Sequence, residues 1–110
     1  MMDEHEFQRK CEAAFAGLQK RLTELGDSHD FEVEGGSGKL EIQFNDDEET
    51  RFVISPNSPV RQIWISALTT SFKLGWSDQA NAFVLEKTGE NLNQVMSRIL
   101  SQQLGASVSV

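Results

Sequence analysis

The sequence has little cysteine, little positive charge and no long apolar run, and each shortage argues against a class of protein. A single cysteine among 110 residues allows no internal disulfide. Lysine and arginine number 10 against 17 aspartates and glutamates, which gives a formal net charge of −7. Nucleic-acid and anionic-membrane surfaces need clustered lysine and arginine, so the charge argues against both partners. No apolar run approaches the roughly 20 residues that span a bilayer, so we expect no membrane helix.

The remaining composition, 38% hydrophobic and 25% charged, is ordinary for one globular domain covering residues 1–110. The start, MMDEHEFQRK, is acidic and polar and therefore unlike a signal peptide. With the single cysteine, this start favours a reducing, cytoplasmic setting in a bacterium. The negative charge favours cations, metal ions or a basic protein as partners. A simpler alternative is that the acidic charge only keeps a small protein in solution.

Apolar side chains at spacings of three and four predict two amphipathic helices, one near each end of the chain. The first helix covers residues 4–25, and Gly26 is placed to end it. Its apolar residues are Phe7, Cys11, Ala14, Phe15, Leu18, Leu22 and Leu25. The second helix stops at Gly105 and carries Leu92, Val95, Met96, Ile99, Leu100 and Leu104. Because Cys11 lies on the apolar stripe, we expect a buried core cysteine there and no nucleophile; the tail after Gly105 should be frayed.

Between the helices, the sequence predicts about six short strands. They lie at residues 30–34, 39–44, 51–54, 60–66, 72–76 and 82–86. The first three alternate strictly between apolar and polar residues, which gives each of them one apolar face. We expect the charged run at 45–50 to be a hairpin loop. The two prolines of SPNSP should interrupt the ladder before the fourth strand, because proline is excluded from ladder interiors.

The order of these elements predicts the fold. Strands that follow each other through tight turns pair antiparallel. Each helix has one apolar stripe, so the economical arrangement packs both helices on the apolar face of the sheet. We therefore predict an α+β fold, a two-layer α-β sandwich with two helices on one face of a mostly antiparallel sheet, in the order α-β-β-β-β-β-β-α. The other face of the sheet stays wet.

The predicted strand at 60–66 presents a tryptophan to this wet face. Ile63 and Ile65 share one side of the strand, so Gln62 and Trp64 take the other. Tryptophan is enriched where proteins bind one another, so an exposed Trp64 indicates a docking surface. The alternative is that a loop or a long basic side chain covers the ring, and Arg61 is the nearest candidate.

Carboxylates gather where the first helix ends and the first strand begins. They are Glu24, Asp27, Asp30, Glu32 and Glu34. Along a strand, carboxylates on one face repeat about every 6.5–7 Å, too far apart for one compact metal cage. They are close enough to attract a hard cation, because oxygen-rich sites suit Mg²⁺, Ca²⁺, Mn²⁺ or iron. The alternative is a solvated acidic edge that binds nothing specific.

The sequence contains no catalytic constellation and no tight metal motif. An EF-hand loop, HExxH and CxxC are all absent, and no Ser/His/Asp or Cys/His set is apparent. GGSG lies between two strands, which is the wrong context for phosphate binding. His5 and His29 each have carboxylates as neighbours, so either could be a metal ligand or simply a surface histidine.

Four stretches together resemble the frataxin family, specifically its bacterial CyaY-type members. They are DEHEFQRK, DFEVEGGSGKLEIQF, VISPNSPVRQIWIS and EKTGENLNQVM. The most specific is ISPNSPVRQIWI at 54–65, which is similar to the family pattern of Ile-Asn, a polar link, Pro, two residues, Gln, an aliphatic residue and Trp. The resemblance runs from Asp3 to about Gly105. It implies the same sandwich of helices and sheet that the patterns predict.

The resemblance also implies a function. Frataxins bind ferrous and ferric iron weakly on an acidic ridge, and they contact the cysteine desulfurase and the scaffold protein of iron–sulfur cluster assembly. Carried over by position, the ridge is Glu24, Asp27, Asp30, Glu32 and Glu34, with Glu6 near the helix start. His29 is an addition that could supply a nitrogen ligand. The partner-facing patch is Gln62 and Trp64, with Arg61 beside it.

The chain also departs from the family pattern. Thr23, Gly26 and Ser28 stand where bacterial relatives often have acids, so we expect weaker or fewer iron sites. The leading hypothesis is a monomeric, non-enzymatic iron chaperone or regulator of iron–sulfur cluster assembly. One alternative is a ferroxidase that oxidises Fe²⁺, although that chemistry favours closely grouped ligands. Another is an acidic protein-interaction module with no metal role.

Overall fold

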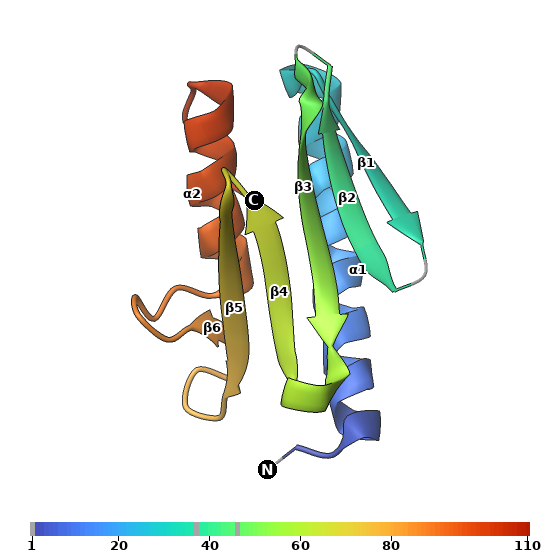
Figure 1. Ribbon diagram of the computed structural model, residues 1–110, viewed down its shortest axis with the longest axis vertical. Helices are drawn as coiled ribbons and strands as arrows, with labels where there is room; N and C mark the ends of the chain where they lie inside the picture. The colour runs from blue at the N-terminus through green and yellow to red at the C-terminus, as the bar shows by residue number, and fades with distance from the viewer. Residues whose placement is uncertain (1, 37, 46) are drawn as a thin grey trace.

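The computed structural model describes residues 2–36, 38–45 and 47–110, which form two helices and one six-stranded sheet (Figure 1). The elements are α1 (Glu4–His29), β1 (Phe31–Gly36), β2 (Lys39–Phe44), β3 (Asp47–Asn57), a 3₁₀ turn (Ser58–Val60), β4 (Gln62–Ala67), β5 (Thr70–Ser77), β6 (Ala82–Leu85) and α2 (Leu92–Leu104). The strands pair antiparallel in chain order, and both helices lie behind the sheet. The predicted α+β sandwich is therefore confirmed.

The core lies between the helices and one face of the sheet, as the alternation predicts. Phe7 and Leu22 of α1 and Ile42, Phe52 and Ile63 of the strands are all 0% exposed. Burying side chains of this size contributes roughly 1.5–3 kcal/mol each, so these contacts dominate the stability of the sandwich. None of the helices in the described part of the chain is both long and apolar enough to cross a membrane.

Helix α1 runs past Gly26, so the prediction that Gly26 ends the helix is wrong. A β-carbon at Gly26 would lie 2.7 Å from the Phe31 carbonyl oxygen, which means that glycine is needed where β1 approaches the helix closely. The helix ends instead at Asp30, whose φ of 55° and ψ of 42° reverse the chain. Asp30 therefore caps α1, and the first strand begins at Phe31.

The third and fourth strands have different bounds from those predicted. β3 continues through Pro56, which pairs with Ile63 of β4. Proline is tolerated there because β2 pairs with β3 only as far as Ile54, so Pro56 lies at the margin of the sheet. β4 begins at Gln62, after Arg61 with a φ of 54° turns the chain.

The loop expected at 45–50 is shorter than predicted. β3 already begins at Asp47, while Asn45 is a turn residue and Asp46 lies outside the described residues. The two remaining strands and the second helix agree with the sequence pattern, and Gly105 ends α2 with a φ of 68°.

The C-terminal tail is docked on α2, so the prediction of fraying is wrong. Val108 is only 7% exposed and belongs to the core. The Ser101 hydroxyl both donates to the Val108 carbonyl (3.2 Å) and accepts from its N–H (3.0 Å). The Ser97 hydroxyl accepts from the Val110 N–H at 2.9 Å. Two serines on α2, which pattern alone treats as surface residues, therefore hold the tail along the helix.

Candidate functional site

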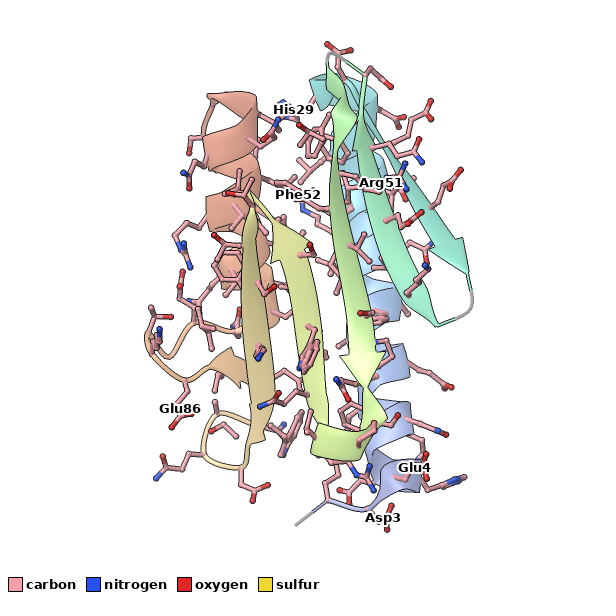
Figure 2. The ribbon with its side chains drawn as sticks, in the orientation of Figure 1. Asp3, Glu4, His29, Arg51, Phe52 and Glu86 are labelled. Carbon is pink, nitrogen blue, oxygen red and sulfur yellow. The ribbon has the colours of Figure 1, made fainter. Side chains whose placement is uncertain are left out.

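The open face of the sheet carries the polar side chains that the alternation predicts (Figure 2). Its residues include Glu32 and Glu34 of β1, Glu41 and Gln43 of β2, Arg51, Val53 and Ser55 of β3, Gln62, Trp64 and Ser66 of β4, and Ser71 and Lys73 of β5. Negative charge lies at the β1 edge of this face. Glu41, one strand further in, lies 3.8 Å from Arg51 and 4.0 Å from Lys39.

Trp64 lies on this open face, and the face assignment is confirmed because Ile63 and Ile65 opposite are 0% and 1% exposed. The ring itself is half-buried. Its Nε1 donates to the Gln62 Oε1 at 2.9 Å, and the Lys73 ammonium lies 4.9 Å from the ring centroid. The ring is therefore held in place by a hydrogen bond and a cation–π contact.

Arg61 is not the cover of Trp64. Its guanidinium turns the other way and donates to the carbonyls of Ser58 and Met2. The covering side chain is Lys73, which is the direct cross-strand partner of Trp64 on β5. Sequence alone missed Lys73, because only strand register identifies it as a neighbour of the ring.

The predicted acidic ridge is a row of exposed carboxylates along the last turns of α1 and along β1. Glu24 lies 3.3 Å from Arg21, whereas Glu32 and Glu34 have no such partner: no described lysine or arginine nitrogen lies within 4.0 Å of either. Among the described residues, no three His, Cys, Asp or Glu side chains come together to hold one metal ion. The ridge can therefore attract cations, but it is not a preformed chelate.

Glu6 and His29 lie at opposite ends of α1. Glu6 is about five helical turns, roughly 27 Å, from Glu24, and Figure 2 shows His29 at the other end from Asp3 and Glu4. Glu6 instead lines a hollow with the N-terminal segment, the turn before β4, and the neighbouring ends of β4 and β5: Met2, Val60, Arg61, Gln62, Gly75, Trp76 and Asp78. The structure therefore separates Glu6 from the ridge and brings it close to the Gln62 end of the open face.

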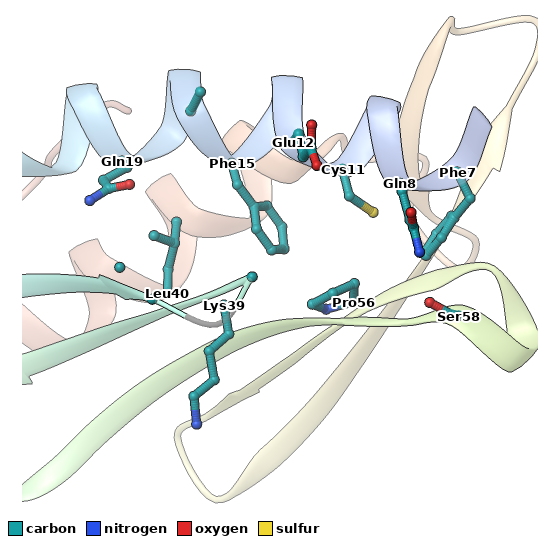
Figure 3. A pocket seen from close by; sticks show the side chains of 14 residues that line it. Phe7, Gln8, Cys11, Glu12, Phe15, Gln19, Lys39, Leu40, Pro56 and Ser58 are labelled. Atoms are coloured by element: carbon teal, nitrogen blue, oxygen red, sulfur yellow. The ribbon is translucent and has the colours of Figure 1, made fainter. Parts of the chain in front are cut away.

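A groove of about 500 Å³ separates α1 from the β1–β2 hairpin (Figure 3). Cys11 and Phe15 point from α1 toward it, with Pro56 on the far wall. Burial, and secondarily the charge of Glu12, raises the pKa of the Cys11 thiol to about 11. The thiol is therefore protonated at neutral pH, in agreement with the prediction of a buried core cysteine.

Comparisons with known proteins agree on one family. A family model described as Frataxin-like domain matches residues 1–106. The iron-sulfur cluster assembly protein CyaY of Pseudomonas fluorescens (strain Pf0-1) is 27% identical over 89 residues, or 79% of each chain. The protein of the same name from Dechloromonas aromatica (strain RCB) is 29% identical over 113 residues, or 97% of each chain.

A solved structure agrees at the level of the fold. A frataxin from Psychromonas ingrahamii, described within the CyaY protein family, superimposes with a TM-score of 0.82 over 98% of this chain and 97% of its own. Its sequence identity is 17%, so this likeness concerns the fold alone. The family model, by contrast, spans nearly the whole chain. The chain belongs to the frataxin family, among its bacterial CyaY-type members.

Proposed function

We propose that this chain is an accessory protein of iron–sulfur cluster assembly, an iron chaperone or regulator that acts in the cytoplasm as a monomer. The relatives of similar length from P. fluorescens and D. aromatica are both named iron-sulfur cluster assembly proteins, which supports the coarse role. The observation that carries the finer role is the pair of exposed carboxylates on β1, Glu32 and Glu34, that no described cation neutralises.

Iron is the cargo of the ridge in this proposal. Carboxylate oxygens suit ferric iron and, less strongly, ferrous iron. Because neighbouring carboxylates on one face of β1 stand about 6.5–7 Å apart, each ion binds one or two side chains and keeps its remaining water ligands. The ligand candidates are Glu24, Asp27, His29, Asp30, Glu32 and Glu34. Glu6 is set aside, because it lies about five helical turns away.

The protein partners in this proposal are the cysteine desulfurase and the scaffold protein. Glu32 and Glu34 of the ridge have no cationic partner among the described residues, and this negative charge suits a basic groove on the desulfurase. The open face presents Trp64, fixed by Gln62 and Lys73, as an aromatic contact for the scaffold or the desulfurase. Arg61 contributes indirectly, because its guanidinium holds the turn that precedes β4.

Iron binding without oxidation is favoured over a ferroxidase role. Catalysed iron oxidation requires ligands grouped around the metal, and the described carboxylates are spread out. On anaerobic addition of Fe²⁺, we expect NMR signals to broaden at 24–34 and to stay sharp at Glu86, an exposed acid outside the ridge. In air, the rate of Fe²⁺ oxidation should be the same with and without the protein. Uniform broadening over all acids would contradict a specific ridge, and faster oxidation would favour the ferroxidase.

Replacing Trp64 separates docking from folding. Trp64→Ala should lower the free energy of unfolding by only about 1–2 kcal/mol, because the ring is half-buried on the open face. Its affinity for the desulfurase–scaffold complex should fall about thirtyfold, the cost of a binding hot spot. Val84→Ala is the control, because Val84 also lies on the open face of the sheet but on β6, away from Trp64. A stability loss of about 3–5 kcal/mol would instead mark Trp64 as a core residue.

A further inference from the structure

The sheet has two edge strands, β1 and β6, and they differ in whether another segment pairs with their outer side. The outer side of β6 is bridged where Val84 pairs with Asn91, just before α2. β1 pairs with β2 along its inner side, in register from Phe31 to Gly36. No described strand pairs with its outer side, and Figure 1 shows β1 as the last ribbon of the sheet. An open edge strand offers unpaired N–H and C=O groups to another chain.

The register identifies which backbone groups are free. The Asn45 N–H donates to the Asp30 carbonyl at 3.0 Å, so residue 30 directs its carbonyl toward β2. Backbone groups alternate in direction along a strand, so Glu32 and Glu34 also bond to β2. Val33 and Gly35 therefore direct their N–H and C=O groups outward. Phe31 has the same direction, but its carbonyl lies against α1 at Gly26.

The free part of the edge, Val33 to Gly36, carries little side-chain bulk. Gly35 and Gly36 have no side chains, and a β-carbon built on Gly36 would meet nothing within 4 Å. On the inner face, the Gln19 amide of α1 covers Gly35, where a β-carbon would lie 2.7 Å from its nitrogen, so the open approach is along the edge and over the outer face. Glu32 and Glu34 project from the open face of the sheet beside this edge and have no cationic partner among the described residues. Backbone groups that can pair and charges that can be neutralised therefore occur at the same place.

The geometry of paired strands indicates which sequence could add to the outer side of β1. On an added antiparallel strand, the residues facing Val33 and Gly35 would exchange hydrogen bonds with them. The residues facing Glu32 and Glu34 would be non-hydrogen-bonded pairs, in which opposite side chains approach most closely. Lysine or arginine at those alternate positions would meet the two carboxylates. A second copy of β1 is a poor occupant, because it would bring further glutamates to the same edge.

We propose that β1 is a strand-addition site for an extended basic segment of a protein partner, with lysine or arginine at alternate positions. This proposal rests on the proposed docking of the ridge to a basic partner and specifies how that contact is made. The backbone of Val33 and Gly35 fixes the register of the incoming segment. Glu32 and Glu34 select its charge.

Synthetic peptides test the proposal on the intact protein. The probe is a seven-residue peptide that alternates lysine and valine. One control is methylated on the valine backbone nitrogens, which face β1, and a second is methylated on the lysine nitrogens, which face away. Each control carries three methyl groups, so both controls have the same charge and the same mass. We expect valine methylation to weaken binding about tenfold or more, because two edge hydrogen bonds are lost, and lysine methylation to change it less than about twofold.

NMR provides the second measurement. The alternating peptide should slow amide hydrogen exchange at Val33 and Gly35, and a peptide of the same composition with its lysines in one block should not. Equal binding of both methylated peptides, or binding without protection at these two amides, would overturn strand addition and leave simple charge attraction. If the desulfurase still binds the protein in that case, the proposed function stands without this contact; if it does not bind, both proposals fail.

Discussion

Gly26→Ala is expected to destabilise the protein by up to about 2 kcal/mol, although alanine is the better helix former. The new β-carbon would lie 2.7 Å from the Phe31 carbonyl oxygen and 3.5 Å from the Phe31 ring. A backbone oxygen that begins β1 cannot move aside as a flexible side chain does. We expect the overpacking, typically about 1–3 kcal/mol, to exceed the roughly 1 kcal/mol gained in helix propensity.

Gly17→Ala is the matched control, because it makes the same chemical change in the same helix. A β-carbon at Gly17 would meet nothing within 4 Å, so only the propensity gain remains. We expect this variant to be about 0.5–1 kcal/mol more stable than the parent. Thermal unfolding should separate the two variants by roughly 10 °C. Equal stability of the two would mean that α1 and β1 lie further apart at Gly26 than the structure places them.

Reversing two charges on the ridge is expected to weaken both of its proposed ligands together. Glu32→Lys with Glu34→Lys changes the charge of the five ridge carboxylates from −5 to −1, since each replacement adds two charges. Both residues are exposed on the open face of β1, so folding should be retained. We expect affinity for Fe²⁺ and for the desulfurase each to fall about tenfold or more. The effect on the desulfurase should shrink as salt rises, because salt screens exposed charges.

The control is a second double variant with the same net charge as the first, but its two charge reversals lie outside the ridge. Glu12→Lys with Glu86→Lys alters two exposed acids outside the ridge. Calorimetric titration with Fe²⁺, and separately with the desulfurase, should give near-parental affinities for this control. If both double variants lose binding equally, the overall charge of the protein acts and the ridge has no special role. Asp30 is left unchanged, because its φ of 55° makes substitution a risk to the fold.

The ridge shows how far sequence patterns reach. Alternation and helix periodicity are local properties, so they placed Glu32, Glu34 and Trp64 on the open face correctly. The same patterns treated Gly26 as a helix stop, because a glycine near the end of an apolar stripe usually is one. The actual reason for glycine is the Phe31 carbonyl, which a one-dimensional pattern does not contain.

By itself, the sequence determined the order of elements, the apolar faces and the family, because burial follows periodicity and the family pattern lies in contiguous residues. Only the tertiary structure decided which side chains meet. It put Lys73 rather than Arg61 over Trp64, separated Glu6 from the ridge, and docked the tail through Ser97 and Ser101. The physical reason is that these contacts join residues far apart in the chain. They depend on strand register and on how closely a helix approaches a strand, and no pattern of neighbouring residues encodes either.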